Sequence, residues 1–263
     1  MRTRFLVILT AVLAIFVLSI IYLNKNAKSQ NDAVEISDTR TVSDKITEKQ
    51  SAKQVDPANV DPSLFLTSTN INNKYFSLPV GRKLIYEGDT EDGLERVEIT
   101  ISGDIKEILG VKTLVYLDKV WLDDELVEET KDYLAQDIYG NVWYFGEDVN
   151  NYEDGRLLDH EGAWLAGVDG AQPGIWIKAA HVVGDSYRQE YYKGKAEDMR
   201  DVSTVGEPIQ IALGSYKDCV KMYDWTPLEP DAKEFKHYCS EVGAMVLETK
   251  PDTGESLKLT GIN

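Results

Sequence analysis

Turn signals that recur about every ten residues constrain the fold of this chain more than any other feature. From Tyr75 onward they separate short segments in which apolar and polar residues alternate, as in Leu94–Ser102. Such a pattern predicts an all-β class with minor α content, built as an antiparallel curved sheet or half-barrel with one wet and one dry face. Short helices are expected near 129–135 and 194–200.

Residues 5–23, FLVILTAVLAIFVLSIIYL, form an apolar run without a charge. At about 1.5 Å per residue, such a helix spans about 28 Å, close to the hydrocarbon thickness of a bilayer. A cleavable signal usually has a shorter apolar part and a small-x-small site, and Lys25 disfavours the best candidate site, at Ala27. We therefore expect a transmembrane anchor or uncleaved signal, with secretion as the outcome if it is cleaved.

The remainder of the chain divides into a tether and a domain. Residues 1–4 contain Arg2 and Arg4 and are expected to stay in the cytoplasm, since positive flanks remain inside. Residues 24–73 are polar with few aromatics, and such a segment buries too little apolar surface to offset its ordering entropy. The sequence thus predicts a disordered tether at 24–73 and an extracytoplasmic antiparallel β domain at 74–263, in the periplasm or at the cell surface.

The net charge of −17 limits the classes of partner. Residues 1–30 hold four cations and no acid, so the rest of the chain is more acidic still. An acidic domain repels phosphate backbones, which argues against nucleic acid, and it also repels anionic lipid surfaces. We expect contact with the membrane to be made through the N-terminal helix.

Both cysteines of the chain, Cys219 and Cys239, lie in one segment that reads as a hairpin around 227–231. If the turn is centred on Glu229, Cys219 faces Cys239 and Tyr223 faces Phe235, and directly opposed cysteines can form a disulfide. A buried thiol pair is the next alternative. Metal or redox chemistry is disfavoured, because no further close ligands and no Cys-x-x-Cys motif accompany the pair. A disulfide would place the domain in an oxidising compartment.

An acidic stretch at 146–155, GEDVNNYEDG, offers hard oxygen ligands of the kind that calcium prefers. Its spacing does not fit an EF-hand loop, so the alternative is a solvated acidic loop, and no other cofactor is expected. The candidate calcium ligands are Glu147, Asp148, Asn150, Glu153 and Asp154.

Aromatic residues are dense after residue 140, where they would suit either a packed core or an apolar groove for a lipid-like ligand. The segment 166–176, AGVDGAQPGIW, reads as a lid or an ordinary crossover. The candidate ligand-binding residues are Trp143, Phe145, Trp164, Trp176, Tyr191 and Trp225.

The sequence offers no catalytic residue by motif. His160, His181 and His237 are not spaced as metal ligands and read as surface or turn residues, and Ser186 has no nearby partner. An enzyme would require Glu147, Asp148 and Asp154 to converge with His160 in a cleft.

Three segments resemble an uncharacterised family of secreted or membrane-anchored bacterial β-rich proteins: Trp143–Asp148, Ala166–Ile175 and the stretch VGDSYRQEYY at 183–192. The ending Tyr238–Glu248 is also similar to that of periplasmic lipoprotein-carrier-like curved sheets. The resemblance spans about residues 74–262. It implies a β-rich extracytoplasmic fold and carries over no catalytic residue.

These observations favour a membrane-tethered extracytoplasmic domain that is not an enzyme and that binds an apolar ligand or an envelope protein. The alternatives are a calcium-dependent or hydrolase-like surface enzyme with a non-local acidic site, and a structural component of the envelope. A carrier predicts a dry aromatic cavity, whereas a scaffold predicts an exposed apolar patch.

Overall fold

The computed structural model describes residues 60–263, so the expected anchor at 5–23 and the expected tether up to residue 59 lie outside this part of the chain. The described part begins with a short 3-10 helix, η1 (Pro62–Leu64), and a two-stranded sheet of β1 (Asn72–Asn73) and β2 (Phe76–Ser77). One large sheet of fifteen strands follows. Its strands are β3 (Lys83–Thr90), β4 (Gly93–Thr100), β5 (Ile105–Ile108), β6 (Val111–Leu122), β7 (Glu125–Gln136), β8 (Val142–Glu153), β9 (Arg156–Asp159), β10 (Trp164–Leu165), β11 (Gly174–Ile177), β12 (Ser186–Arg188), β13 (Met199–Ile211), β14 (Gly214–Trp225), β15 (Glu234–Cys239), β16 (Ala244–Lys250) and β17 (Glu255–Ile262).

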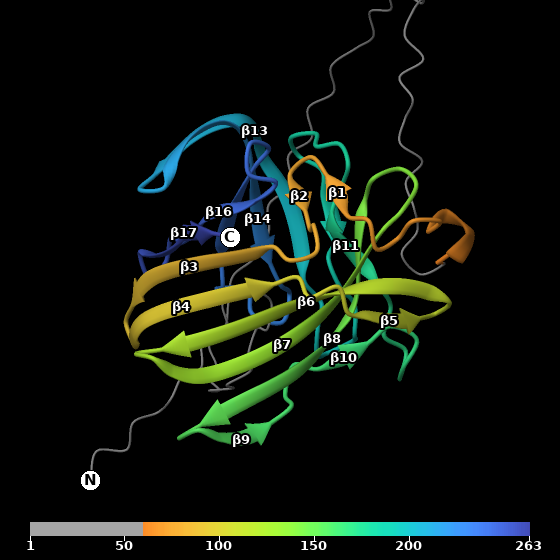
Figure 1. Ribbon diagram of the computed structural model, residues 1–263, viewed down its shortest axis with the longest axis horizontal. Helices are drawn as coiled ribbons and strands as arrows, with labels where there is room; N and C mark the ends of the chain where they lie inside the picture. Colours follow the sequence, from red (N-terminus) through yellow and green to blue (C-terminus); the bar gives the residue numbers. More distant parts are fainter. Residues whose placement is uncertain (1–59) are drawn as a thin grey trace, which may run out of the picture. The chain divides into compact units, whose positions relative to one another are not determined.

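The large sheet runs in the order β10-β8-β7-β6-β4-β3-β17-β16-β15-β14-β13-β12 (Figure 1). Strands β9 and β11 also pair with β8, and β5 pairs with β6. Every pairing in it is antiparallel, which confirms the all-β antiparallel class expected from the alternation. Most neighbours are consecutive hairpins, but β17 returns to pair with β3 and so joins the two ends of the domain.

The sheet curls so that strands distant in its order face each other. The ring of Phe76 lies 5.9 Å from that of Tyr116 on β6 and 6.1 Å from that of Tyr238 on β15, measured between centroids. We call the face of the sheet that carries Tyr116 and Tyr238 the inner face. Side chains alternate between the two faces along each strand except where a bulge shifts the register, as between Asp132 and Leu134 on β7.

The sheet is not closed by a continuous ladder, although its two ends approach each other. An isolated bridge joins Gln172, just before β11, to Tyr191, just after β12. Gly174 on β11 also lies against the backbone of Gln189, where an added Cβ would stand 2.1 Å from the carbonyl oxygen. A glycine is required there, since no side chain fits between the two segments.

The hairpin of β14 and β15 confirms the expected cysteine pairing. Cys219 lies directly opposite Cys239, Tyr223 lies opposite Phe235, and the two sulfur atoms form a disulfide. The ladder ends at the pair of Asp224 and Glu234. The next pair of the expected register, Trp225 with Lys233, is therefore not formed. The pairing was predictable because a short hairpin fixes its own register through the position of the turn.

Both expected helices are wrong. Residues 129–135 belong to β7, and residues 194–200 form a turn followed by the start of β13. The segment before Gln136 contains good helix formers, but it pairs on both sides with β6 and β8, so tertiary pairing overrides local propensity.

Residues 60–73, which the sequence assigns to the tether, belong to the folded domain. They form η1 and β1 and bury Phe65 and Ile71. Within residues 60–263, no helix has the length and apolar character needed to cross a bilayer.

Candidate functional site

Part of the inner face is filled by aromatic side chains that pack against one another. The ring centroids of Tyr144 and Trp176 are 5.1 Å apart, and Trp176 also contacts Phe76 and Tyr116 at 5.6 and 5.9 Å. Such contacts are those of an ordinary close-packed core. We call this group the aromatic part; it consists of Phe76, Tyr116, Tyr144, Trp164, Trp176 and Tyr238.

The structure separates the six aromatics that the sequence grouped as candidate ligand contacts. Trp143 and Phe145 pack against Phe65, with Trp143 donating to Asp137 Oδ2 at 2.9 Å. Trp164 and Trp176 instead pack on either side of Tyr144, in the aromatic part. The half-buried Tyr191 lies against Arg188, and the half-buried Trp225 ends β14. The four tryptophan and phenylalanine rings of the first two groups are core residues and contact other side chains.

A chain of ion pairs crosses the inner face from β13 to β16. Arg200, fully buried, donates from Nε and Nη2 to the two oxygens of Asp224 at 2.7 and 2.5 Å. Lys236 Nζ lies 3.3 Å from Asp224 Oδ2, 3.2 Å from Glu234 Oε2 and 3.7 Å from Glu248 Oε2. Although burial opposes ionisation, Arg200 and Lys236 hold the pKa of Asp224 below its ordinary value. We call this group the ionic ladder; it consists of Arg200, Asp224, Glu234, Lys236, Glu248 and Lys250.

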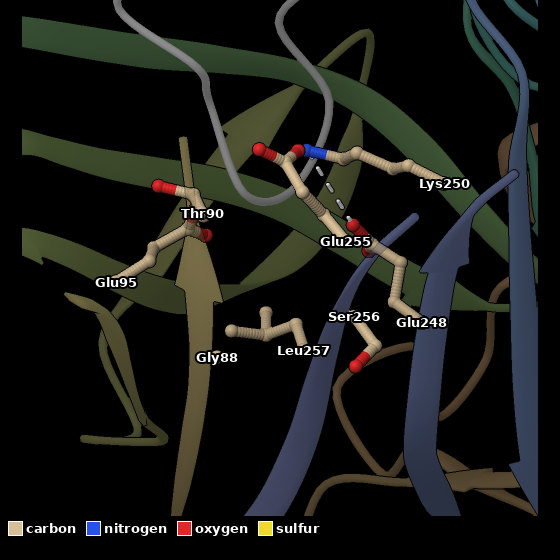
Figure 2. A pocket seen from close by; sticks show the side chains of 8 residues that line it. All are labelled: Gly88, Thr90, Glu95, Glu248, Lys250, Glu255, Ser256 and Leu257. Carbon is tan, nitrogen blue, oxygen red and sulfur yellow. Dashed lines mark ion pairs between the residues drawn. The ribbon is translucent and has the colours of Figure 1, made fainter. Parts of the chain in front are cut away.

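The ionic ladder ends at a cleft between β16, β17, β3 and β4 (Figure 2). Strand register places Glu95 opposite Gly88 and Leu257 opposite Glu248, so the four positions form one row across the sheet. Gly88 has no side chain, and the backbone of β17 lies close against it at Ser256 and Leu257. The cleft is small, with a cavity volume of about 10 Å³, and it is partly open to solvent. Its lining residues are Gly88, Thr90, Glu95, Glu248, Lys250, Glu255, Ser256 and Leu257.

The carboxylates of this cleft lack sufficient partners. Glu95 and Glu248 are only 4% and 2% exposed. Lys250 Nζ lies 4.0 Å from Glu248 Oε1, but Glu248 Oε2 and Glu255 Oε2 are buried without a hydrogen bond in the described part of the chain. Burial raises the pKa of Glu95 to about 8, with Lys250 opposing the shift and Glu248 adding to it. Burial likewise raises the pKa of Glu248.

A second set of buried acids occupies the inner face of β6, β7 and β8. Glu147 lies opposite Asp132, and Asp118 lies opposite Thr130 between Asp132 and Glu128. Each of the four acids has one side-chain oxygen that finds no hydrogen-bond donor among the described residues. We call this set the acid cluster; it consists of Asp118, Glu128, Asp132 and Glu147.

Burial disfavours the charged form of every acid in the acid cluster. Burial raises the pKa of Glu128 to about 7, and it does the same for Asp132. The pKa of Asp118 and that of Glu147 are raised well above the ordinary range, first by burial and then by neighbouring acids, which for Glu147 include Glu190. An unpartnered buried carboxyl group costs stability, so the fold alone gives no reason to place four of them together.

The structure does not gather the candidate calcium ligands. Residues 146–153 belong to β8, so Glu147 faces inward, whereas Asp148 faces outward and pairs with Lys106 at 3.2 Å. Asn150 shares the outward direction, Glu153 ends the strand, and Asp154 occupies the turn with a positive φ of 51°. Within residues 60–263, no three His, Cys, Asp or Glu side chains are arranged to hold a metal ion.

The three histidines occupy separate positions in the described structure, each with its own contacts. The exposed His160 is hydrogen-bonded through Nδ1 to the carbonyl oxygen of Val149 at 2.8 Å. His181 packs edge-on against Tyr75, and burial lowers its pKa to about 4. His237 is buried on β15, unlike the surface position expected for it, because it pairs with Lys221 and Leu247 inside the sheet.

The sequence analysis missed Glu95, Glu248 and the acid cluster, although the alternation carried a signal for them. Glu95 has the same parity as the buried Val97 and Ile99, and Asp118 has the same parity as Tyr116 and Val120. An acid at an apolar position of an alternating strand must face inward. The partners of each acid could not be inferred, since they depend on the pairing of distant strands.

Comparison with known proteins adds a fold-level likeness. No family model matches the chain, and no curated protein matches it. The fold is similar to a solved structure from Parabacteroides distasonis described as a "putative lipoprotein", with a TM-score of 0.40 and 12% sequence identity over 72% of this chain and 98% of that chain. At this level the likeness says nothing about what the chain binds.

Proposed function

We propose that the chain is a membrane-tethered, extracytoplasmic binding domain without catalytic activity. The apolar run at 5–23 supports the tether, and the disulfide of Cys219 and Cys239 supports an oxidising compartment. The acidic domain would be held near the membrane by this segment alone, because its charge opposes adsorption to anionic lipid.

One observation carries the binding role: the inner face buries carboxyl groups that the domain itself leaves incompletely hydrogen-bonded. Glu147 in the acid cluster is 2% exposed, and its Oε2 has no hydrogen bond among residues 60–263. Glu248 in the cleft is equally buried, and its oxygens meet only the ammonium groups of Lys236 and Lys250, at 3.7 and 4.0 Å, beyond hydrogen-bond distance. Because such groups lower stability, their presence is explained by a ligand or partner that supplies donors. The ligand or partner is therefore polar at its point of contact.

The apolar ligand expected from the aromatic residues is less well supported. Trp143 and Phe145 are fully buried and pack on Phe65, and Trp176 packs within the aromatic part. Side chains that already fill one another's surfaces present no wall to a lipid tail. An apolar portion of a ligand would have to lie outside this packed region.

Native mass spectrometry of the full chain purified from membranes tests the proposal. We expect the protein in the membrane fraction, with a mass two hydrogens below that of the dithiol form and with a non-covalent ligand or partner attached. Persistently empty protein would contradict the binding role. Protein in the cytosolic fraction with reduced thiols would contradict the tether and the compartment.

A further inference from the structure

We propose that the cleft of Figure 2 binds a primary ammonium group, carried by a small free amine or by the headgroup of an ethanolamine lipid. The inference deepens the proposed binding function and rests on it. Four properties of the cleft support it: its charge, its unpartnered acceptors, its size and its construction.

The charge of the cleft favours a cation. Three carboxyl groups, those of Glu95, Glu248 and Glu255, line it together with a single ammonium group, that of Lys250. Lys250 is already shared, since its Nζ also lies 3.7 Å from Glu234 Oε1. Glu95 has no ion-pair partner within 4.0 Å among the residues that the structure describes. An anion would meet the carboxyl groups of Glu248 and Glu255, and the one ammonium group that lines the cleft is already shared with Glu234.

The acceptors of the cleft suit a group with several N–H donors. Glu248 Oε2 and Glu255 Oε2 have no hydrogen bond within the described part of the chain, and Figure 2 shows the Glu248 and Glu255 side chains on the same side as Lys250. One oxygen of Glu255 is fixed by the backbone N–H of Glu91 at 2.9 Å, which leaves the other oxygen free to accept. A primary ammonium group has three donors and can satisfy two carboxylates at once, without the convergence of three ligands that a metal ion needs. A quaternary ammonium group has none.

The size of the cleft fits a headgroup and excludes a large ligand. The cavity volume of about 10 Å³ is close to what one water molecule or one ammonium group needs. The cleft is partly open to solvent, so a short chain attached to the ammonium group can lead outward. A metal ion is disfavoured, because no three acidic, His or Cys side chains in residues 60–263 converge as ligands.

The backbone of β17 forms one wall of the cleft. Gly88 lies between Glu95 and Leu257 in the cross-strand row, and a Cβ at this position would stand 2.2 Å from the carbonyl oxygen of Ser256. The close approach of β17 thus excludes any side chain at this position, so only glycine fits beside Glu95. Glu95 and Glu248 are 153 residues apart in sequence and meet only because β17 pairs with β3.

Calorimetric titration of the full chain with ethanolamine near pH 7 tests the proposal. We expect saturable binding that Glu95→Gln weakens about tenfold or more, because a charge-assisted hydrogen bond is lost. The matched control is Glu98→Gln, on the same strand but opposite Ile85 on the outward face, and it should bind like the wild type. Choline, which has the same charge but no N–H donor, should not compete.

The number of protons released on binding gives a second test, because this number would not change if Glu95 had only a structural role. Burial raises the pKa of Glu95 to about 8; Lys250 opposes this shift, and Glu248, Glu234 and Glu255 add to it, so the neutral carboxyl group is favoured at pH 7. An ammonium group that binds beside it favours the charged form and should release a proton. Titrations in two buffers with different ionisation enthalpies should therefore give different heats for the wild type and equal heats for Glu95→Gln.

Several results would overturn the inference. The first is the absence of binding at tens of millimolar ethanolamine, and the second is binding of choline as strong as that of ethanolamine. The third is unchanged binding by Glu95→Gln at an unchanged melting temperature. Any of these results would mean that the cleft holds only water. If the natural source is a lipid, native mass spectra of wild-type protein should retain phosphatidylethanolamine and those of Glu95→Gln should not. If it is a free amine, only the titration responds. A cytosolic location would defeat the proposed function while leaving the titration valid.

Discussion

The inner face has an aromatic part and a charged part, and the charged part consists of the ionic ladder, the acid cluster and the cleft of Figure 2. The two parts belong to one sheet but differ in how well their polar groups are partnered. In the aromatic part the rings pack on one another, and two of the polar tips have partners: the hydroxyl of Tyr144 donates to Asp132 Oδ1 at 2.7 Å, and Trp164 Nε1 donates to Glu190 Oε2 at 2.9 Å. Trp176 Nε1 has no hydrogen bond among the described residues. In the charged part, by contrast, the second oxygen of Asp132 and one oxygen of Glu248 have no hydrogen bond among residues 60–263. The aromatic part is explained by folding alone. The charged part costs stability and needs a further reason, which we identify as binding.

The largest expected effect concerns the best-paired group of the charged part. Asp224→Ala would leave Arg200, which is fully buried, without its two-pronged partner. Because an uncompensated charge would remain inside, we expect a loss of about 3–5 kcal/mol in the free energy of unfolding, measured by denaturant titration of the full chain. Asp252→Ala, at an exposed ion pair 3.9 Å from Lys233, should change it by less than about 0.5 kcal/mol. Equal effects of the two substitutions would show that the ionic ladder does not hold the sheet.

The disulfide gives a reference that lies on the other face of the sheet. Cys219 and Cys239 alternate with the inward-facing Val220 and Tyr238, so their bond touches neither part of the inner face. Replacing both by serine should lower the free energy of unfolding by about 3 kcal/mol, because the unfolded chain regains the freedom of a closed loop. A reducing agent should lower the stability of the wild type to that of the variant and leave the variant unchanged. No effect of reduction on the wild type would contradict the assigned bond.

The dependence of stability on pH should come from the charged part. The pKa values of Glu128 and Asp132 are raised to about 7, and that of Glu95 to about 8, with burial as the first cause in each case. The folded state therefore binds protons more tightly than the unfolded state. The contribution of these groups to the free energy of unfolding is fully present below the ordinary pKa of a carboxyl group and is lost as pH rises through the raised pKa values. Between about pH 4.5 and pH 8 we expect a fall of at least about 1 kcal/mol per pH unit.

Unfolding curves recorded at several pH values check this expectation. Glu128→Gln, which cannot ionise, should make the fall less steep. Stability that rises steadily from pH 5 to pH 8 would mean that the acids are ionised and well solvated in the folded state.

The same comparison explains how far the sequence could predict the structure. The strands and the cysteine register were predictable, because alternation and a hairpin turn are local features and Cys219 fixes the position of Cys239. The expected helix at 129–135 failed, since the residues of β7 are set by pairing with β6 and β8. Helix-forming residues give way to such pairing when one face must be buried.

The site was harder to predict than the fold. Aromatic residues such as Trp176 were predicted to bind a ligand, but in the structure they lie in the packed part of the inner face. The acidic stretch attracted a metal role, yet strand alternation sends Glu147 and Asp148 to opposite faces. Glu95 and Glu248 escaped notice because no local pattern connects them; the return of β17 to β3 does.

The most direct test of the central claim asks whether the acid cluster serves folding or something else. Glu147→Met replaces a 2% exposed carboxyl, whose Oε2 has no hydrogen bond in the described residues, by an apolar side chain of similar length. Glu153→Met, at the exposed end of the same strand, is the matched control. If the acid is kept for binding, denaturant titration at pH 8 should show Glu147→Met to be more stable than the wild type by about 1 kcal/mol or more, with the control unchanged. A clear loss of stability in Glu147→Met alone would mean that the buried acids hold the sheet together, which contradicts the account.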